Sequence, residues 1–129
     1  MKKDVFVERV LKQESQVLAI DFDGVIHKNS KGFHDGSVYD DPIEGACESI
    51  EMLSKKYSIV IFSCKALTDR PLVDNKTGIQ LIWEWLEFHG MSQFVDDVTF
   101  KKPRALFYID DKGIRFTNWE QTMGFLNEK

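Results

Sequence analysis

Three short, mainly apolar runs stand out along the chain, and polar residues follow each of them. They cover residues 17–20, 58–64 and 105–109. Runs of this kind are typical of strands that are buried on both faces of a parallel sheet. Between and after them, apolar residues recur with a helical period. The alternation predicts an α/β fold, a Rossmann-like three-layer sandwich around a central parallel sheet.

Local signals place the helices and loops around these strands. Pro42 suits the start of the helix after the first strand, because a missing N–H is no loss at that position. Gly90 suits the end of the next helix. Further elements are expected at residues 5–11 (a short amphipathic helix), 29–41 and 65–76 (polar loops), 98–100 (a short strand) and from 118 onward (a last helix).

Acidic and hydroxyl side chains gather where the predicted strands end. Asp21 and Asp23 come with the first strand, Ser63 with the second, and Asp110 and Asp111 with the third. Ligands of open parallel sheets bind outside the carboxyl ends of the strands. We therefore expect these side chains to line one crevice.

The chemistry of such a crevice follows from its charge. Asp21 and Asp23 are two positions apart, so they point to the same side of an extended chain, and Gly24 lets the backbone turn sharply after them. Crowded carboxylates repel one another, and a hard divalent cation such as Mg²⁺ relieves that repulsion. A bound cation attracts phosphate, one carboxylate can attack phosphorus, and a second can transfer protons.

Four segments resemble the motifs of the haloacid dehalogenase (HAD) superfamily of phosphohydrolases, in the family's order. They are D-F-D-G-V at 21–25, I-F-S at 61–63, K-P at 102–103 and Y-I-D-D at 108–111. The resemblance implies a Mg²⁺-dependent phosphomonoester hydrolase that acts through an aspartyl-phosphate. It would be a single HAD-like domain, residues 1–129, with a minimal cap or none.

The resemblance also implies a role for each matching residue. Asp21 would be the nucleophile and a metal ligand. Asp23 would be the general acid and base, with its backbone carbonyl on the metal. Asp110 would be the third protein ligand of Mg²⁺, supported by Asp111 directly or through water, and Ser63 would hold the transferring phosphate.

Two lysines compete for the role of neutralising the phosphate. Lys102 matches the family's motif, but it precedes Asp110 by only eight positions. On one continuous strand the two would lie roughly 25 Å apart, at ~3.3 Å per residue. A separate strand at 98–100 would bring Lys102 close to the crevice, and Pro103 favours the break in the chain that this requires. We prefer Lys102, with Lys65 as the alternative.

Composition narrows the choice of partners. The net charge of −4 gives no broad basic surface for nucleic acid, and no apolar run is long enough to span a membrane. Two cysteines are too few for a disulfide framework, and charged residues interrupt the apolar start of the chain, so no signal peptide is predicted. We expect a cytoplasmic protein that acts on a small phosphorylated substrate, such as a nucleotide, or on a larger phosphate ester.

Two other functions fit parts of the pattern. A phospho-accepting receiver-like module also collects acidic residues, a hydroxyl and a lysine at strand ends. Receiver domains, however, have two adjacent acidic residues after their first strand, whereas this chain has D-x-D at that place. The second alternative function is a phosphatase that acts on polynucleotide or nucleotide ends, because a domain without a cap leaves its site open to such substrates. His27 could contact the substrate or be a loop residue, and we prefer the loop residue. Cys64 is interpreted as a small buried side chain.

Overall fold

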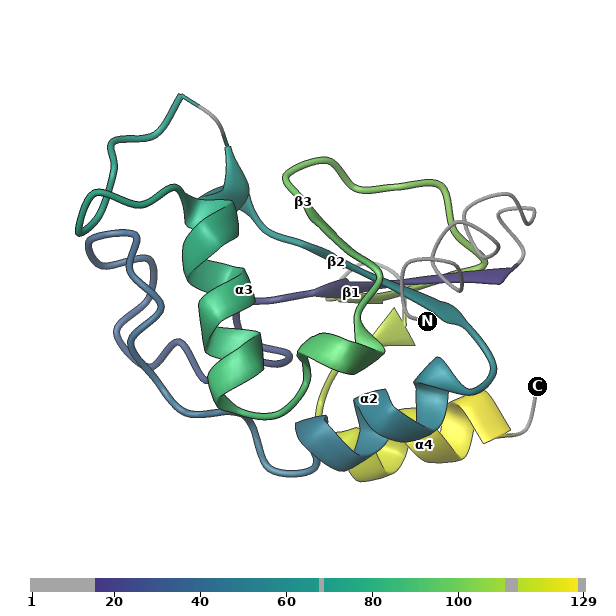
Figure 1. Cartoon of the computed structure of the whole chain (residues 1–129). Helices are drawn as coiled ribbons and strands as arrows, with labels where there is room; N and C mark the ends of the chain where they lie inside the picture. Colours follow the sequence, from purple (N-terminus) through teal and green to yellow (C-terminus); the bar gives the residue numbers. More distant parts are fainter. Residues whose placement is uncertain (1–15, 68, 111–113, 128–129) are drawn as a thin grey trace.

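Five strands form one sheet in the order β3-β2-β1-β4-β5, and every neighbouring pair is parallel (Figure 1). The computed structural model describes residues 16–67, 69–110 and 114–127. The predicted α/β fold with a central parallel sheet is confirmed. The strands are β1 (Val17–Asp21), β2 (Ser58–Phe62), β3 (Asp97–Thr99), β4 (Phe107–Asp110) and β5 (Ile114–Arg115).

The central position of β1 follows from its side chains. Leu18, Ala19 and Ile20 are fully buried, so the strand needs cover on both faces and neighbours on both edges. Ile20 lies opposite Ile61 of β2 and Ile109 of β4. Asp21 and Asp110 come directly beyond this isoleucine layer, and Ser63 follows Phe62 at the end of β2. The predicted residues therefore lie at one edge of the sheet.

The helices are α2 (Ala46–Ser54), α3 (Gly78–Phe88) and α4 (Trp119–Asn127), with the 3-10 turns η2 (Cys64–Ala66) and η3 (Ser92–Phe94). Helices α2 and α4 pack side by side below the sheet in the view of Figure 1. The buried Trp119 donates its Nε1–H to the carbonyl of Val25 at 3.0 Å. Helices α2 and α4 cover the same face of the sheet (Figure 1), so their packing does not show that helices cover both faces. The three-layer arrangement therefore stays a prediction. The helix expected at 5–11 lies outside the described residues.

The start of α2 corrects one predicted boundary. Pro42 does not begin a helix, because it forms an antiparallel bridge with His27. The helix begins at Ala46, after Gly45 turns the chain with φ 87°. Pro42 thus closes a loop after β1 rather than starting a helix.

The ends of β2 and β4 differ from the prediction by a few residues. β2 ends at Phe62 because Ser63 Oγ accepts a hydrogen bond from the backbone N–H of Lys65 at 3.1 Å and so begins a 3-10 turn. β4 begins at Phe107, two residues later than expected. Gly90 follows the end of α3 with φ 76°, as predicted.

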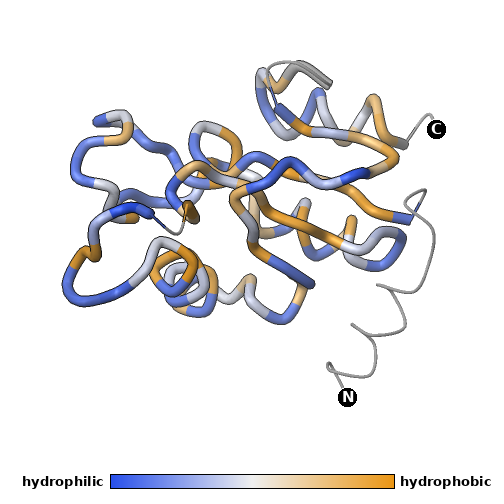
Figure 2. The backbone as a smooth tube through the Cα atoms, turned by 90° about the horizontal axis from the view of Figure 1, so that it is seen from above, coloured by the Kyte–Doolittle hydropathy of each residue, from blue (hydrophilic) through white to orange (hydrophobic). Residues whose placement is uncertain are grey.

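Two polar loops extend beyond the carboxyl ends of β1 and β2, and Figure 2 shows their mainly hydrophilic colouring beside the apolar strands. The first, residues 28–41, is called the flap below. Its base is held by main-chain hydrogen bonds from Lys28 N to Asp41 O (3.0 Å) and from Ile43 N to Ile26 O (2.8 Å). Among the described helices, none has the length and apolar character needed to cross a lipid bilayer.

Candidate active site

The strand ends bring the predicted residues together at one edge of the sheet. Asp21 and Asp110 come directly after the paired residues Ile20 and Ile109, and neighbouring strands lie about 4.8 Å apart. Ser63 follows β2, on the other side of β1. From β1 the chain continues to β2 and β3 on one side of the sheet and then crosses to β4 and β5 on the other. Open α/β sheets bind ligands at such a switch point, which here lies between β1 and β4.

A tight turn after β1 holds Asp23 over this edge. The carbonyl of Phe22 accepts hydrogen bonds from the backbone N–H groups of Ile26 (2.9 Å) and His27 (3.0 Å). Gly24 has φ 84°, in the left-handed region that glycine adopts without strain. The turn brings the chain back on itself, so that His27 meets the side chain of Asp23.

The two carboxylate oxygens of Asp23 have different surroundings. Oδ1 accepts a hydrogen bond from Nδ1 of His27 at 2.9 Å and another from Nζ of Lys65 at 3.0 Å. Oδ2 lies 3.5 Å from the hydroxyl of Ser63. The side chain keeps 17% of its surface exposed. Oδ1 is therefore held by two donors, while Oδ2 has one long contact, with Ser63.

These contacts also decide the charge of Asp23. Burial would raise the pKa of its carboxyl group, but the hydrogen bond from His27 and the positive charge of Lys65 outweigh that effect and hold the pKa below its ordinary value. Asp23 is therefore a carboxylate at neutral pH. That is the form of a general base that takes a proton from water.

His27 belongs to the site, and interpreting it as a loop residue is wrong. Its side chain is fully buried. The ring stacks on Phe22 at a centroid distance of 5.2 Å and meets the edge of Trp85 at 5.6 Å. The sequence feature that could have predicted this contact is the spacing of the two residues. A glycine turn between an aspartate and a histidine four positions later brings their side chains together.

Both candidate lysines lie at this edge, each on a different carboxylate. Lys65 is 2% exposed and, besides Asp23, donates to the carbonyl of Ser37 at 3.1 Å. Lys102 is more exposed, with its Nζ 2.6 Å from Oδ2 of Asp110. The predicted separate strand exists as β3, and Lys102, which follows it, reaches Asp110 at the carboxyl edge of the sheet.

The predicted metal ligands are placed only in part. Asp21, Asp23 and Asp110 lie at the carboxyl edge of the sheet, while Asp111 lies outside the described residues. Within the described ranges, no group of three or more His, Cys, Asp or Glu side chains is arranged to hold a metal ion. A cation here would depend on two carboxylates, a backbone carbonyl and water.

Cys64 corrects another expectation. It is exposed rather than buried, while the neighbouring Ser63 is only 3% exposed. The 3-10 turn that begins at this point explains why Ser63 is buried and Cys64 is exposed. The hydroxyl of Ser63 turns inward and accepts a hydrogen bond from the backbone N–H of Lys65. The hydroxyl, and not the thiol, therefore faces the carboxylates.

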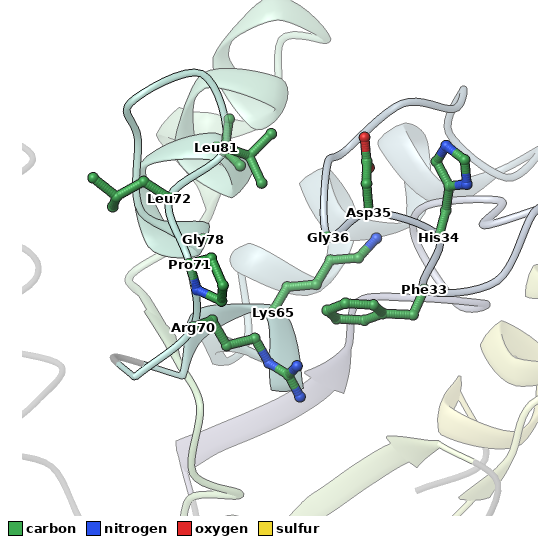
Figure 3. A pocket seen from close by; sticks show the side chains of 11 residues that line it. Phe33, His34, Asp35, Gly36, Lys65, Arg70, Pro71, Leu72, Gly78 and Leu81 are labelled. Atoms are coloured by element: carbon green, nitrogen blue, oxygen red, sulfur yellow. The ribbon is translucent and has the colours of Figure 1, made fainter.

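A cavity of about 210 Å³ lies beside Lys65, between the flap and the loop that follows β2 (Figure 3). The guanidinium carbon of Arg70 lies 4.5 Å from the ring centroid of Phe33, and its Nε donates to the carbonyl of Cys64 at 3.0 Å. Lys65 passes close to the same ring in Figure 3. Two cations and an aromatic ring therefore border a hollow next to Asp23.

Asp40 in the flap gives a testable pH dependence. Hydrogen bonds from the hydroxyl and backbone N–H of Ser30, and from the N–H of Asp41, lower the pKa of Asp40 to about 2. A lowered pKa means that these bonds are intact above the ordinary value of 3.8 and are lost as the pH falls toward 2. We expect the carboxyl ¹³C resonance of Asp40 to titrate near 2, and Ser30→Ala to move the midpoint toward 3.8. A wild-type midpoint at the ordinary value would contradict this.

Comparison with known proteins adds no relative: no protein-family model matches the chain, and neither the curated proteins nor the solved structures searched contain a significant match.

Proposed function

We propose that this protein hydrolyses phosphomonoesters with the help of Mg²⁺, through a phosphorylated Asp21. The observation that carries the proposal is the meeting of Lys102 and Asp110 at 2.6 Å, although only seven residues separate them in the sequence. A strand-end carboxylate on each of two neighbouring strands, a hydroxyl and two ammonium groups then share one edge. This is the set of groups that phosphoryl transfer through a carboxylate needs.

The first half of the reaction belongs to Asp21 and Asp23. A carboxylate oxygen of Asp21 attacks phosphorus, and the bond between phosphorus and the ester oxygen breaks. That oxygen leaves with a proton from Asp23, which in the first turnover the Asp23 carboxylate has taken up from solvent. Ser63 would donate to a phosphoryl oxygen. Lys102 would exchange its contact with Asp110 for the phosphate, whose charge it offsets.

The second half returns the chain to its starting state. A water molecule attacks phosphorus and gives a proton to the carboxylate of Asp23, and the bond from phosphorus to Asp21 breaks to release inorganic phosphate. Asp23 leaves this step protonated and can serve the next ester. Asp23 Oδ2 lies 3.5 Å from Ser63 Oγ, so Asp23 would lie beside a phosphate bound by Ser63.

The donor set at this edge fits Mg²⁺. This ion is commonly bound by one or two carboxylates together with water, and Asp21 and Asp110 end neighbouring strands. These two side chains and the backbone carbonyl of Asp23 would hold it. When bound, it would supply positive charge against the phosphate oxygens.

Removing the metal tests this proposal. We expect EDTA to lower hydrolysis of 4-nitrophenyl phosphate by at least about 100-fold, because the carboxylates would then repel the phosphate, and added Mg²⁺ to restore it. Turnover that is unchanged after exhaustive chelation would rule out the metal. A panel of free nucleotides and 5′-phosphorylated oligonucleotides, assayed in the same way, separates a small-molecule phosphatase from one that acts on nucleic-acid ends.

The strand order favours this function over a receiver-like module. Receivers use the flavodoxin-like order 2-1-3-4-5, whereas this sheet has the order β3-β2-β1-β4-β5. Asp23 would also speed the loss of phosphate from Asp21, which a signalling module must retain. A phosphorylated chain that persists for hours in Mg²⁺ would support the receiver-like module instead.

A further inference from the structure

We infer that His27 and Lys65 are positioning residues that lock one oxygen of Asp23 and thereby aim the other at the reacting phosphate. The inference rests on the proposed function for its kinetic consequence, but its structural part stands on hydrogen bonds alone. It also gives Lys65 a role different from that of Lys102. Lys65 would orient the proton-transferring carboxylate, and Lys102 would bind the phosphate.

The hydrogen bonds of His27 define which nitrogen carries its proton. Nε2 lies 2.9 Å from the backbone nitrogen of Asp40, and a backbone N–H can only donate, so Nε2 accepts and carries no proton. The proton then resides on Nδ1, which donates to Oδ1 of Asp23 at 2.9 Å. Full burial between aromatic rings leaves the imidazole no freedom to turn over.

Lys65 holds the same oxygen from another direction. Its ammonium lies 3.0 Å from Oδ1 of Asp23 and 3.1 Å from the carbonyl of Ser37. With its side chain fully buried, this ammonium is not placed like Lys102, whose side chain is 40% exposed. A buried cation that is already bonded to Asp23 and to the flap is poorly placed to follow a phosphate in and out.

The two oxygens of the Asp23 carboxylate would therefore have different roles. Oδ1 accepts two hydrogen bonds, while Oδ2 lies beside Ser63 Oγ, where the phosphate would bind. A proton that is moved between Asp23 and the ester must therefore travel through Oδ2. If the hold on Oδ1 is lost, the carboxylate can rotate, and proton transfer becomes slower while phosphate binding is retained.

Leaving-group dependence provides a kinetic test with His27→Leu and Lys65→Met. An alkyl phosphate needs a proton on its leaving oxygen, whereas 4-nitrophenolate leaves without one. We expect kcat/KM, which reports the steps up to the release of the alcohol, to fall by ~10–100-fold for an alkyl phosphate and by less than about 3-fold for 4-nitrophenyl phosphate. His27→Asn retains a donor near the position of Nδ1 and should recover most of the alkyl activity. Equal losses on both esters, or His27→Asn no better than His27→Leu, would overturn the inference.

Two further variants serve as controls. Lys102→Met should raise KM and lower kcat/KM on both esters alike, because it removes a charge on the phosphate itself. Lys76→Met removes an exposed surface ion pair with Glu84 and should leave both esters unaffected. If Lys65→Met behaves like Lys102→Met, Lys65 binds phosphate and the assignment is wrong.

A measurement on the unmodified protein is independent of activity and of variants that fail to fold. In ¹⁵N NMR of the folded chain, the imidazole of His27 should show a directly bonded proton on Nδ1 and none on Nε2. A proton on Nε2 would refute the inference even in an active enzyme. The Nδ1–H form in a chain without phosphatase activity would uphold the geometry and refute only the proposed function.

Discussion

Asp21→Asn is expected to lower turnover of 4-nitrophenyl phosphate by at least about 10⁴-fold, because an amide cannot serve as the attacking nucleophile. Asp21 ends β1 directly beyond the isoleucine layer and beside Asp110 of β4. The substitution keeps the size of the side chain but removes its charge. The protein should therefore still fold while losing its reaction.

The matched control for this variant is Asp97→Asn, at the exposed first residue of β3, which lies opposite Val60 of β2. It removes one negative charge as well and should leave turnover within about twofold of the wild type, as surface changes usually do. Beryllium fluoride, which mimics a phosphoryl group on aspartate, should bind the wild type and not Asp21→Asn. Full activity in Asp21→Asn would mean that another residue attacks phosphorus.

Gly78→Ala is expected to have the largest effect on stability. A Cβ atom at Gly78 would lie 1.5 Å from the backbone oxygen of Lys65 and 2.5 Å from its carbonyl carbon. Both atoms are backbone, so η2 and the start of α3 would have to separate. We expect a loss of about 3 kcal/mol or more in the free energy of unfolding. Because Lys65 would shift as well, any folded fraction should also be slower on alkyl phosphates.

Gly124→Ala provides the contrast, since the same substitution in α4 meets nothing within 4 Å. There the added methyl group only favours the helix, and we expect a gain of roughly 0.5–1 kcal/mol. Urea denaturation of the two variants beside the wild type measures both effects. Equal stability of Gly78→Ala and wild type would mean that η2 and α3 are not in the close contact described.

The strands could be predicted because burial on both faces leaves a strong apolar signal. The run at 17–20 became β1, the run at 58–64 became β2, which ends two residues earlier, and the separate strand at 98–100 became β3, shifted by one residue. β5 could not be predicted, because two residues, Ile114 and Arg115, are too few to form a pattern. The start of α2 was misplaced because Pro42 fits a β-bridge as well as a helix start.

The sequence predicted those residues of the candidate site that stand at the ends of strands. Asp21, Ser63 and Asp110 needed only the rule that parallel strands share a carboxyl edge. His27 needed knowledge of a turn, since its contact with Asp23 arises from a backbone fold of six residues and not from a periodic pattern. The separate partners of Lys65 and Lys102 depend on side-chain geometry, which the sequence does not encode in any spacing.

The flap's attachment to Asp23 has a consequence for how this protein can diversify. The flap reaches Asp23 through Lys65 and His27. The hydrogen bonds come from its main chain, the carbonyl of Ser37 and the N–H of Asp40, and the ring of Tyr39 packs against both side chains. Main-chain groups are the same whichever side chain stands at the position, apart from proline. The tip of the flap, which borders the cavity, can therefore accept new side chains, by evolution or by engineering, while the carboxylate of Asp23 keeps its supports. Under the proposed function, selectivity toward the ester's organic group and the efficiency of proton transfer could then be altered separately.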